Sequence, residues 1–270
     1  MSRVEVLMSC MHEKDWSLVQ TSNVCSDIVL VNQCDRDEKQ AFTFTDQQGQ
    51  QHQGQFVCST RRGLSVSRNT AIEHAQSEFC LIADDDELFT SDYDEQIAKT
   101  FDQHSDCDVI AFHIDGSTMR TPSQACRIGY LKALRISSLQ IAFRRESIVK
   151  AGIRFDEQMG SGTGHGAGEE EKFLYDCLRK GLRIHYVPIT IATLQDRNPS
   201  QWFKGFDARY FFNRGWATRR FMGWPMATLY SFYFTFAKRK RFQGQMTAIS
   251  ALKLMLKGIR HKEYPKDLQL

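Results

Sequence analysis

The sequence contains 270 residues, of which 41% are hydrophobic and 25% are charged, and its formal net charge is +3. That length suits one large α/β domain or two small ones, and the composition is ordinary for a soluble globular protein. The small net charge gives no support for a protein that binds nucleic acid.

The cysteines and the amino terminus exclude further classes. No two of the eight cysteines form a C-x-x-C pair, so the sequence offers neither a zinc knuckle nor a redox motif. Single cysteines inside apolar runs are typical of proteins in a reducing cytoplasm. The amino terminus enters a strand at once, without the basic and apolar regions of a signal peptide, so we expect none.

The first two predicted strands belong to a βαβ unit. Val4, Val6 and Met8 recur with a period of two, and a short helix separates them from a second buried strand predicted at 27–31. The first strand leads into S-C-M-H-E-K-D, and the second ends in N-Q-C-D at 32–35. In a Rossmann-like half, the carboxyl ends of two such strands face a nucleotide. The alternative for the second motif is an ordinary polar turn.

A hairpin and a helix are predicted next. Strand-like runs at 41–45 and 56–59 flank a glutamine- and glycine-rich hairpin tip or exposed loop, to which we assign no function. The sequence G-L-S-V-S-R-N then opens a helix that Ser65 or Ser67 can cap, which would place Arg68 in the first turn. A cation there is unfavourable against the helix dipole, unless a bound phosphate at the helix N-terminus compensates it.

A buried strand at 79–83 ends abruptly in Asp84, Asp85 and Asp86. Three adjacent carboxylates repel one another, so a cation among them would stabilise the cluster. At the carboxyl end of a central strand we expect Mg²⁺ or Mn²⁺, which would hold a diphosphate. The alternative is a solvated acidic turn.

A glycine-rich segment and a well-marked helix follow further along the chain. The segment 159–168 holds five glycines, which is typical of a loop that closes over a substrate. Within it, His165 is a possible third metal ligand, although no ligand spacing supports it. Three glutamates open the helix at 169–180 and basic residues close it, so dipole complementation alone can explain them.

The carboxy-terminal part is aromatic, apolar and basic. Lys204 lies in the cluster W-F-K-G-F, which can form a lid over a diphosphate or can pack in the core. The apolar run 221–237, followed by four basic residues at 238–241, fits an interfacial contact with the cytoplasmic membrane face better than a span. An amphipathic pattern at 252–262 repeats this theme. The alternative is a helical tail packed on the core.

The motifs GLSVSRN, ADDDE and GEEEKF, in this order, resemble glycosyltransferase family 2, the inverting sugar-nucleotide transferases of the GT-A fold. SCMHEKD, VNQCD and WFKG extend the likeness to bacterial enzymes that build surface polysaccharides, over about residues 3–215. The resemblance implies an α/β GT-A domain at 1–200 with a mixed central sheet. Its nucleotide-binding half would span about 1–115 and its acceptor half about 116–200, before a helical extension at 201–270.

The resemblance also implies roles for particular residues. Asp84 and Asp86 would hold Mg²⁺ or Mn²⁺. Glu170 would be the general base because it stands where the family's G-E-D motif has its aspartate, while Glu169 stays a candidate since a glutamate reaches further. The donor would be a nucleoside-diphosphate sugar, with UDP favoured, and the residues implied to bind it are Ser9, Met11, Asn32, Gln33, Asp35, Arg68, Asn69, Asp84, Asp85 and Lys204.

Two other functions stay open. A nucleotidyltransferase that makes the sugar nucleotide shares the sheet and the metal requirement, but SCMHEKD supplies no glycine for its phosphate loop. An inactive relative that serves as a membrane-bound assembly subunit is the other alternative. The intact acidic cluster and the intact G-E-E argue against it.

Overall fold

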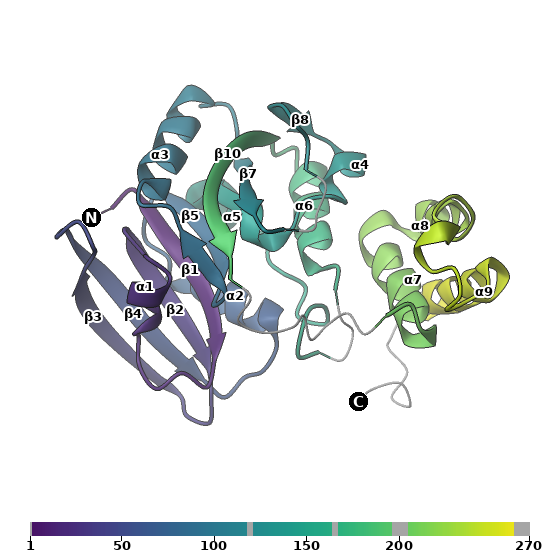
Figure 1. Ribbon diagram of the computed structural model, residues 1–270, viewed down its shortest axis with the longest axis horizontal. Coiled ribbons are helices and arrows are strands. Elements are labelled where there is room, and N and C mark those ends of the chain that lie inside the picture. The colour runs from purple at the N-terminus through teal and green to yellow at the C-terminus, as the bar shows by residue number, and fades with distance from the viewer. Residues whose placement is uncertain (1, 118–120, 164–166, 196–204, 262–270) are drawn as a thin grey trace.

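The computed structural model describes residues 2–117, 121–163, 167–195 and 205–261 (Figure 1). Within these ranges a mixed sheet forms the centre of the molecule, with the strand order β3-β4-β2-β1-β5-β9-β7-β10-β6, and β8 pairs with β10. The strands are β1 Val4–Met11, β2 Asp27–Gln33, β3 Glu38–Thr45, β4 Gln51–Ser59, β5 Phe79–Asp84, β6 Glu87–Phe89, β7 Val109–Asp115, β8 Cys126–Ile128, β9 Ile141–Arg144 and β10 Ile184–Leu194.

The pairing of the central strands identifies the fold class. β1 pairs in parallel with β2 and with β5, and β2 pairs in parallel with β4. β9 then runs antiparallel to both β5 and β7. The five apolar residues of β5 are fully buried, because both faces of the sheet are covered. The expected α/β fold with a Rossmann-like half and a mixed sheet is confirmed.

Helices cover both faces of the sheet and also form a separate group at one end (Figure 1). Residues of α2 and α6 belong to the core on one face, and residues of α1 and α3 to the core on the other. The α-helices are α1 Leu18–Thr21, α2 Leu64–His74, α3 Tyr93–Gln103, α4 Tyr130–Ala133, α5 Arg145–Ala151, α6 Glu169–Arg179, α7 Ala208–Met222, α8 Trp224–Phe232 and α9 Ala248–Arg260. Three shorter helical segments are η1 Ser138–Gln140, the π-helical η2 Tyr233–Ala237 and η3 Arg239–Arg241.

The start of α2 corrects the expected helix cap. Gly63 is the N-cap residue, at a φ of 117°, and no side chain caps the helix. The hydroxyl of Ser65 donates instead to the carbonyl of Met159, and the hydroxyl of Ser67 bonds to that of Ser9. Arg68 therefore lies beyond the first turn, and its expected position at the helix N-terminus was wrong.

The predicted hairpin is present, but its turn is shorter than expected. β3 and β4 pair antiparallel, and half of the Gln/Gly-rich segment, residues 51–55, lies within β4. Asp46 forms the turn, because one of its oxygens accepts the backbone N–H groups of Gln48 and Gln50 while the other lies 2.8 Å from Nε2 of His52. The polar composition of this segment suggested a longer loop, because composition gives no information about these local hydrogen bonds.

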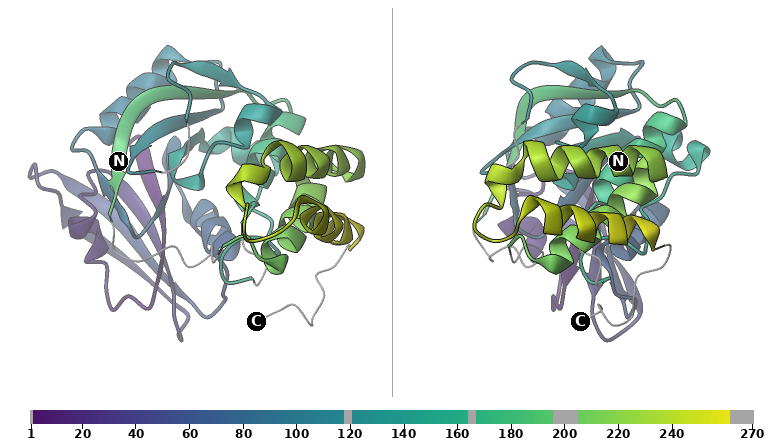
Figure 2. Two further views of the ribbon diagram at one scale, coloured as in Figure 1. Left: turned by 45° about the vertical axis from the view of Figure 1, so that its right-hand side comes forward. Right: turned by 90° about the vertical axis from the view of Figure 1, so that its right-hand side faces the viewer.

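The carboxy-terminal helices α7, α8 and α9 enclose a core of their own, which contains Phe211, Phe234, Phe242, Ala251 and Met255. α8 and α9 lie side by side at the outer end of the molecule (Figure 2). Gly215 of α7 and Gly258 of α9 let the two backbones approach. A Cβ atom on Gly215 would lie 2.1 Å from the carbonyl oxygen of Met255.

This packing supports the interpretation of α9 as a helix packed on the core. Met255 is fully buried, and Leu252 and Leu256 are partly buried. The apolar stripe of α9 therefore packs on the rest of the chain, and its membrane contact stays a prediction. In the described ranges, no helix has the length and apolar character needed to cross a bilayer.

Candidate active site

The acidic cluster lies where β5 ends. Asp84 is the last residue of β5, and Asp85 and Asp86 form the turn into β6. Glu87 begins β6, is fully buried, and accepts the backbone N–H of Asp84 at 3.0 Å. Burial, together with the charges of Asp84 and Asp86, raises the pKa of Asp85 to about 6. The predicted position of the carboxylates at a strand end is confirmed.

Arg68 joins this cluster to the helix with the three glutamates. Its guanidinium is fully buried and donates to both oxygens of Asp84, at 3.1 and 3.2 Å. It also donates to Glu169 at 3.1 Å and to the hydroxyl of Ser138 at 2.9 Å. Burial by itself would lower the pKa of Arg68, but Asp84 and Glu169 raise it above the ordinary value. In this structure Arg68 contacts protein groups rather than an open surface.

The three glutamates at the start of α6 have different surroundings. Glu169 is buried against Arg68. Glu171 is buried against Arg214 of α7, whose two terminal nitrogens donate to its two oxygens at 2.8 and 3.0 Å. Glu170 forms no ion pair with any residue that the structure describes. Its Oε2 and the Oε2 of Glu169 are both buried without a hydrogen-bond partner there.

These surroundings change the basicity of Glu170. Burial, followed by the charges of Glu169 and Glu171, raises the pKa of Glu170 well above its ordinary value. A carboxylate with a raised pKa holds a proton more readily, which is the property required of a general base. Arg68 holds Glu169 in an ion pair, and Arg214 holds Glu171 in another. Among the described residues, Glu170 thus differs from Glu169 and Glu171 in having no ion pair.

Several of the expected nucleotide-binding residues bond to the backbone. The amide of Asn32 accepts the N–H of Glu13 and donates to its carbonyl, at 3.0 and 2.8 Å. Gln33 accepts the N–H of Gly63 at 2.8 Å. Asn69 bonds in both directions to the backbone of Phe155. These amides hold the loops after β1 and β2 and the helix α2 in position.

Other candidates stay accessible at the same edge. Met11 is 49% exposed at the end of β1, and Asp35 is exposed beside Arg62. A hollow of about 350 Å³ lies between the segments that follow β1 and β2, and its lining includes Glu13 and Asp35. Ser9 is buried. Lys204 and His165 lie outside the described residues.

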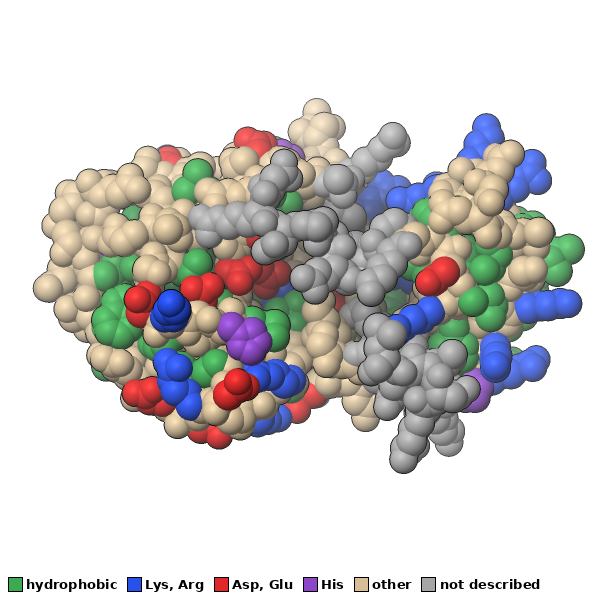
Figure 3. Space-filling view, turned by 60° about the horizontal axis from the view of Figure 1, so that its bottom comes forward, with side chains coloured by type: hydrophobic (Ala, Val, Ile, Leu, Met, Phe, Trp, Pro, Cys, Tyr) green, Lys and Arg blue, Asp and Glu red, His purple; other side chains and the backbone are tan. Residues whose placement is uncertain are grey.

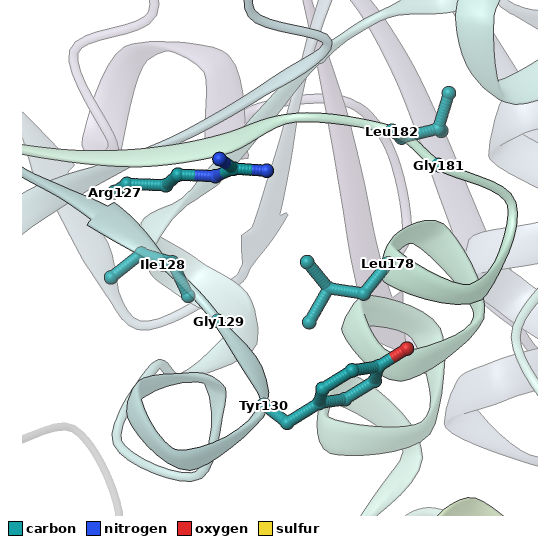
Figure 4. A pocket seen from close by; sticks show the side chains of 7 residues that line it. All are labelled: Arg127, Ile128, Gly129, Tyr130, Leu178, Gly181 and Leu182. Carbon is teal, nitrogen blue, oxygen red and sulfur yellow. The ribbon is translucent and has the colours of Figure 1, made fainter.

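A second hollow, of about 360 Å³, lies between β8, α4 and the carboxyl end of α6 (Figure 4). Tyr130 and Leu178 line it from opposite sides. Because it lies at the far end of α6 from the glutamates, it contains none of the predicted site residues.

Four further residues take part in these contacts without having been predicted. Glu87 bonds to Asp84 and Ser138 to Arg68, while Glu171 and Arg214 pair with each other. Glu87 and Glu171 lie next to recognised motifs in the sequence, and this proximity could have identified them as candidates. Ser138 and Arg214 lie in segments without a motif, and only the packing of the chain brings them to the site.

The cluster fits a divalent cation in part. Carboxylate oxygens suit Mg²⁺, which proteins commonly hold through one or two carboxylates together with substrate phosphates. Asp84 and Asp86 offer that donor set. Among the described residues there is no group of three or more His, Cys, Asp or Glu side chains that could hold a metal by itself. Both oxygens of Asp84 already accept hydrogen bonds from Arg68, so Mg²⁺ or Mn²⁺ at this cluster stays a prediction.

The comparison with protein families decides the identity of the fold. A model described as glycosyl transferase family 2 matches residues 18–156, which is more than half of the chain. The chain belongs to glycosyl transferase family 2. The match includes the helix with Arg68 and the acidic strand end but stops before α6. No curated protein matches the sequence of this family 2 member.

Solved structures share the fold of this family 2 chain. The TarS fragment 1–349 of S. aureus in complex with UDP-GlcNAc is 16% identical and has a TM-score of 0.60, with 99% of this chain and 83% of that chain covered. The same fragment in complex with UDP is 14% identical, with a TM-score of 0.59 and coverages of 96% and 81%. At such identities the likeness establishes the GT-A type fold.

Proposed function

We propose that the protein transfers a sugar from a nucleoside-diphosphate sugar, with a UDP-sugar favoured, to a hydroxyl of a glycan or lipid-linked glycan, with inversion at the anomeric carbon. The observation that carries this proposal is the separation of the glutamates: Glu170 lacks an ion pair among the described residues, whereas Glu169 and Glu171 each bind an arginine. Membership of glycosyl transferase family 2 supports the reaction class. The structures of TarS with UDP-GlcNAc and with UDP support the donor class.

In this proposal Glu170 removes the proton from the acceptor hydroxyl as the hydroxyl oxygen attacks the anomeric carbon. A general base works best when its pKa lies near the working pH, and the raised pKa of Glu170 moves it in that direction. Glu169 and Arg68 position the first turn of α6. The nucleotide would lie at the ends of β1 and β2, near the hollow that Asp35 lines.

Asp84 and Asp86 would hold Mg²⁺ or Mn²⁺ against the diphosphate. When bound, the cation would neutralise the charge that develops on the leaving nucleoside diphosphate. Asp85 would support the ribose or orient a ligand. Arg68, through its bonds to Asp84 and Glu169, would keep the donor side and the acceptor side of the site at a fixed distance.

The pathway we propose is bacterial surface polysaccharide biosynthesis, on the strength of the motifs SCMHEKD, VNQCD and WFKG. A polyprenyl-linked acceptor lies in a membrane, so this function places the enzyme at the cytoplasmic membrane face.

The full-length protein tests this function in two steps. A panel of nucleotide sugars with Mn²⁺ is first screened by thermal shift, because a bound ligand stabilises the folded state by mass action. The donor that binds is then assayed for release of the nucleoside diphosphate, with and without metal. Pyrophosphate released from a nucleoside triphosphate and a sugar phosphate would instead identify a nucleotidyltransferase. A donor that binds but is never turned over would indicate an inactive assembly subunit.

A further inference from the structure

The outward side of α8 and η2 is more apolar than the inward side. We call this outward side the α8 face. Its residues are exposed to between 46% and 63%, and they are Trp224, Met226, Leu229, Phe232, Tyr233 and Phe236. Leu229, Phe232 and Phe236 recur at spacings of three and four, so they share one side of the helical segment.

The inward side of the same segment is built largely from small and hydroxyl-bearing residues. Ala227, Ser231 and Thr235 are buried at the spacing of one helical face, together with Phe234. The hydroxyl of Ser231 donates to the carbonyl of Ala227, and that of Thr235 donates to the carbonyl of Ser231, each at 2.8 Å. A helix on a water-exposed surface has the opposite arrangement, with its apolar side inward. The polarity of α8 is thus inverted.

Basic residues adjoin the α8 face. Lys238, Arg239, Lys240 and Arg241 follow η2 directly, and all four are exposed. The ammonium group of Lys238 lies 5.5 Å from the ring centre of Tyr233, so cationic and aromatic groups share one surface. Figure 3 shows hydrophobic side chains flanked by Lys and Arg at the end of the molecule that the C-terminal helices form.

We propose that the α8 face binds the interface of an anionic lipid bilayer, with its aromatic and aliphatic side chains among the acyl chains and residues 238–241 on the lipid headgroups. Aromatic residues are favoured at the headgroup level of a membrane, and basic residues beside them are attracted by anionic lipids. A second copy of this chain is a poorer occupant, because it would bring two clusters of four cations together.

The absence of a membrane-spanning helix from the described ranges agrees with binding at the surface. Only the choice of the cytoplasmic membrane rests on the proposed function. Lipid binding itself requires neither a donor nor turnover.

The experiment is sedimentation of the full-length protein with vesicles, without donor. Vesicles of phosphatidylglycerol and phosphatidylcholine are compared with vesicles of phosphatidylcholine alone. Wild-type protein is expected in the pellet with the anionic vesicles. Lys240→Gln with Arg241→Gln should lower the partition coefficient by about 10- to 30-fold at low salt. Leu229→Ser with Phe232→Ser and Phe236→Ser should lower it further.

Matched control variants separate a loss of binding at the α8 face from a general effect of removing charge or apolar surface. Lys150→Gln with Lys180→Gln removes two positive charges from exposed positions elsewhere, and Ile249→Ser removes an exposed apolar side chain from α9. Both should bind vesicles as the wild type does.

The proposal would be overturned if the wild-type protein stayed in the supernatant with anionic vesicles, or if the control variants lost binding as much as the test variants. It would also be overturned if the wild type were a dimer that bound no vesicles and that the triple serine variant converted to a monomer. Because donor turnover is measured separately in solution, its failure would contradict the proposed function and leave this inference standing.

Discussion

Nη1 of Arg68 lies 3.1 Å from Oε1 of Glu169, although 101 residues separate the two in the sequence. The same guanidinium bonds to Asp84 at the end of β5. A single buried cation therefore connects the acidic strand end to the first turn of α6. This connection pairs Glu169 with a cation, while burial and the charges of Glu169 and Glu171 raise the pKa of Glu170.

The first prediction separates the two candidate bases. Glu170→Gln keeps the size of the side chain but cannot accept a proton, so kcat should fall by about 10²- to 10⁴-fold while donor affinity persists. Glu169→Gln is the matched control one residue away, and it should retain much more activity. Steady-state kinetics with the donor found in the screen would measure both. If Glu169→Gln loses activity and Glu170→Gln keeps it, the assignment is reversed.

The second prediction concerns the pH dependence of the same enzyme. Glu170 must be ionised to accept a proton, so kcat should rise with pH through its raised pKa. The charge of Glu169 is one cause of that increase. In Glu169→Gln the acidic limb of the pH–rate profile should therefore move to lower pH. A limb at the same pH in both enzymes would show that Glu170 is not the titrating group.

The third prediction concerns stability and follows from the same shift. The folded state holds the Glu170 proton to a higher pH than the unfolded state, so between the two pKa values the folded state binds more protons and stability falls as pH rises. Glu170→Gln should remove this loss. The difference in free energy of unfolding between Glu170→Gln and the wild type should therefore shift in favour of the variant from acid to neutral pH. Urea titrations would measure it. A difference that does not change with pH would contradict the raised pKa.

The fourth prediction concerns Arg68. Replacing it with methionine leaves Asp84 and Glu169 as buried or partly buried carboxylates without their cation, which should cost about 3–5 kcal/mol of unfolding free energy. Arg36→Met is the control, because the pair of Arg36 with Glu38 is exposed, and its unfolding midpoint should match that of wild type. Equal midpoints for the two variants would show that the buried network contributes no stability.

The fifth prediction concerns metal. Asp86→Asn should abolish transfer and metal-dependent donor binding while leaving the unfolding transition intact, because it removes a charged oxygen ligand from the turn after β5. Isothermal titration with donor and Mn²⁺ would measure the binding. Unchanged turnover in this variant would exclude Asp86 as a ligand.

The overall character of the fold was predictable from the sequence because its determinants are local. Apolar runs such as 79–83 specify buried strands, and glycine and acidic residues mark where the next elements begin. The carboxylates at the end of β5 were placed correctly for that reason. The capping of α2 was not, and the packing of α9 was only one of two alternatives, since Ser65 bonds to Met159 and Met255 packs on α7 through contacts that are distant in the sequence.

The sequence by itself determined the order of the elements, the acidic strand end and the three glutamates at the start of a helix. Only the tertiary structure shows which of these glutamates are ion-paired. Arg68 and Arg214 lie 101 and 43 residues from their partners Glu169 and Glu171, and they reach them only because α2 and α7 pack around the first turn of α6. Adjacent residues with the same side chain thus acquire different surroundings, since ion pairing and burial depend on neighbours in space rather than on neighbours in the chain.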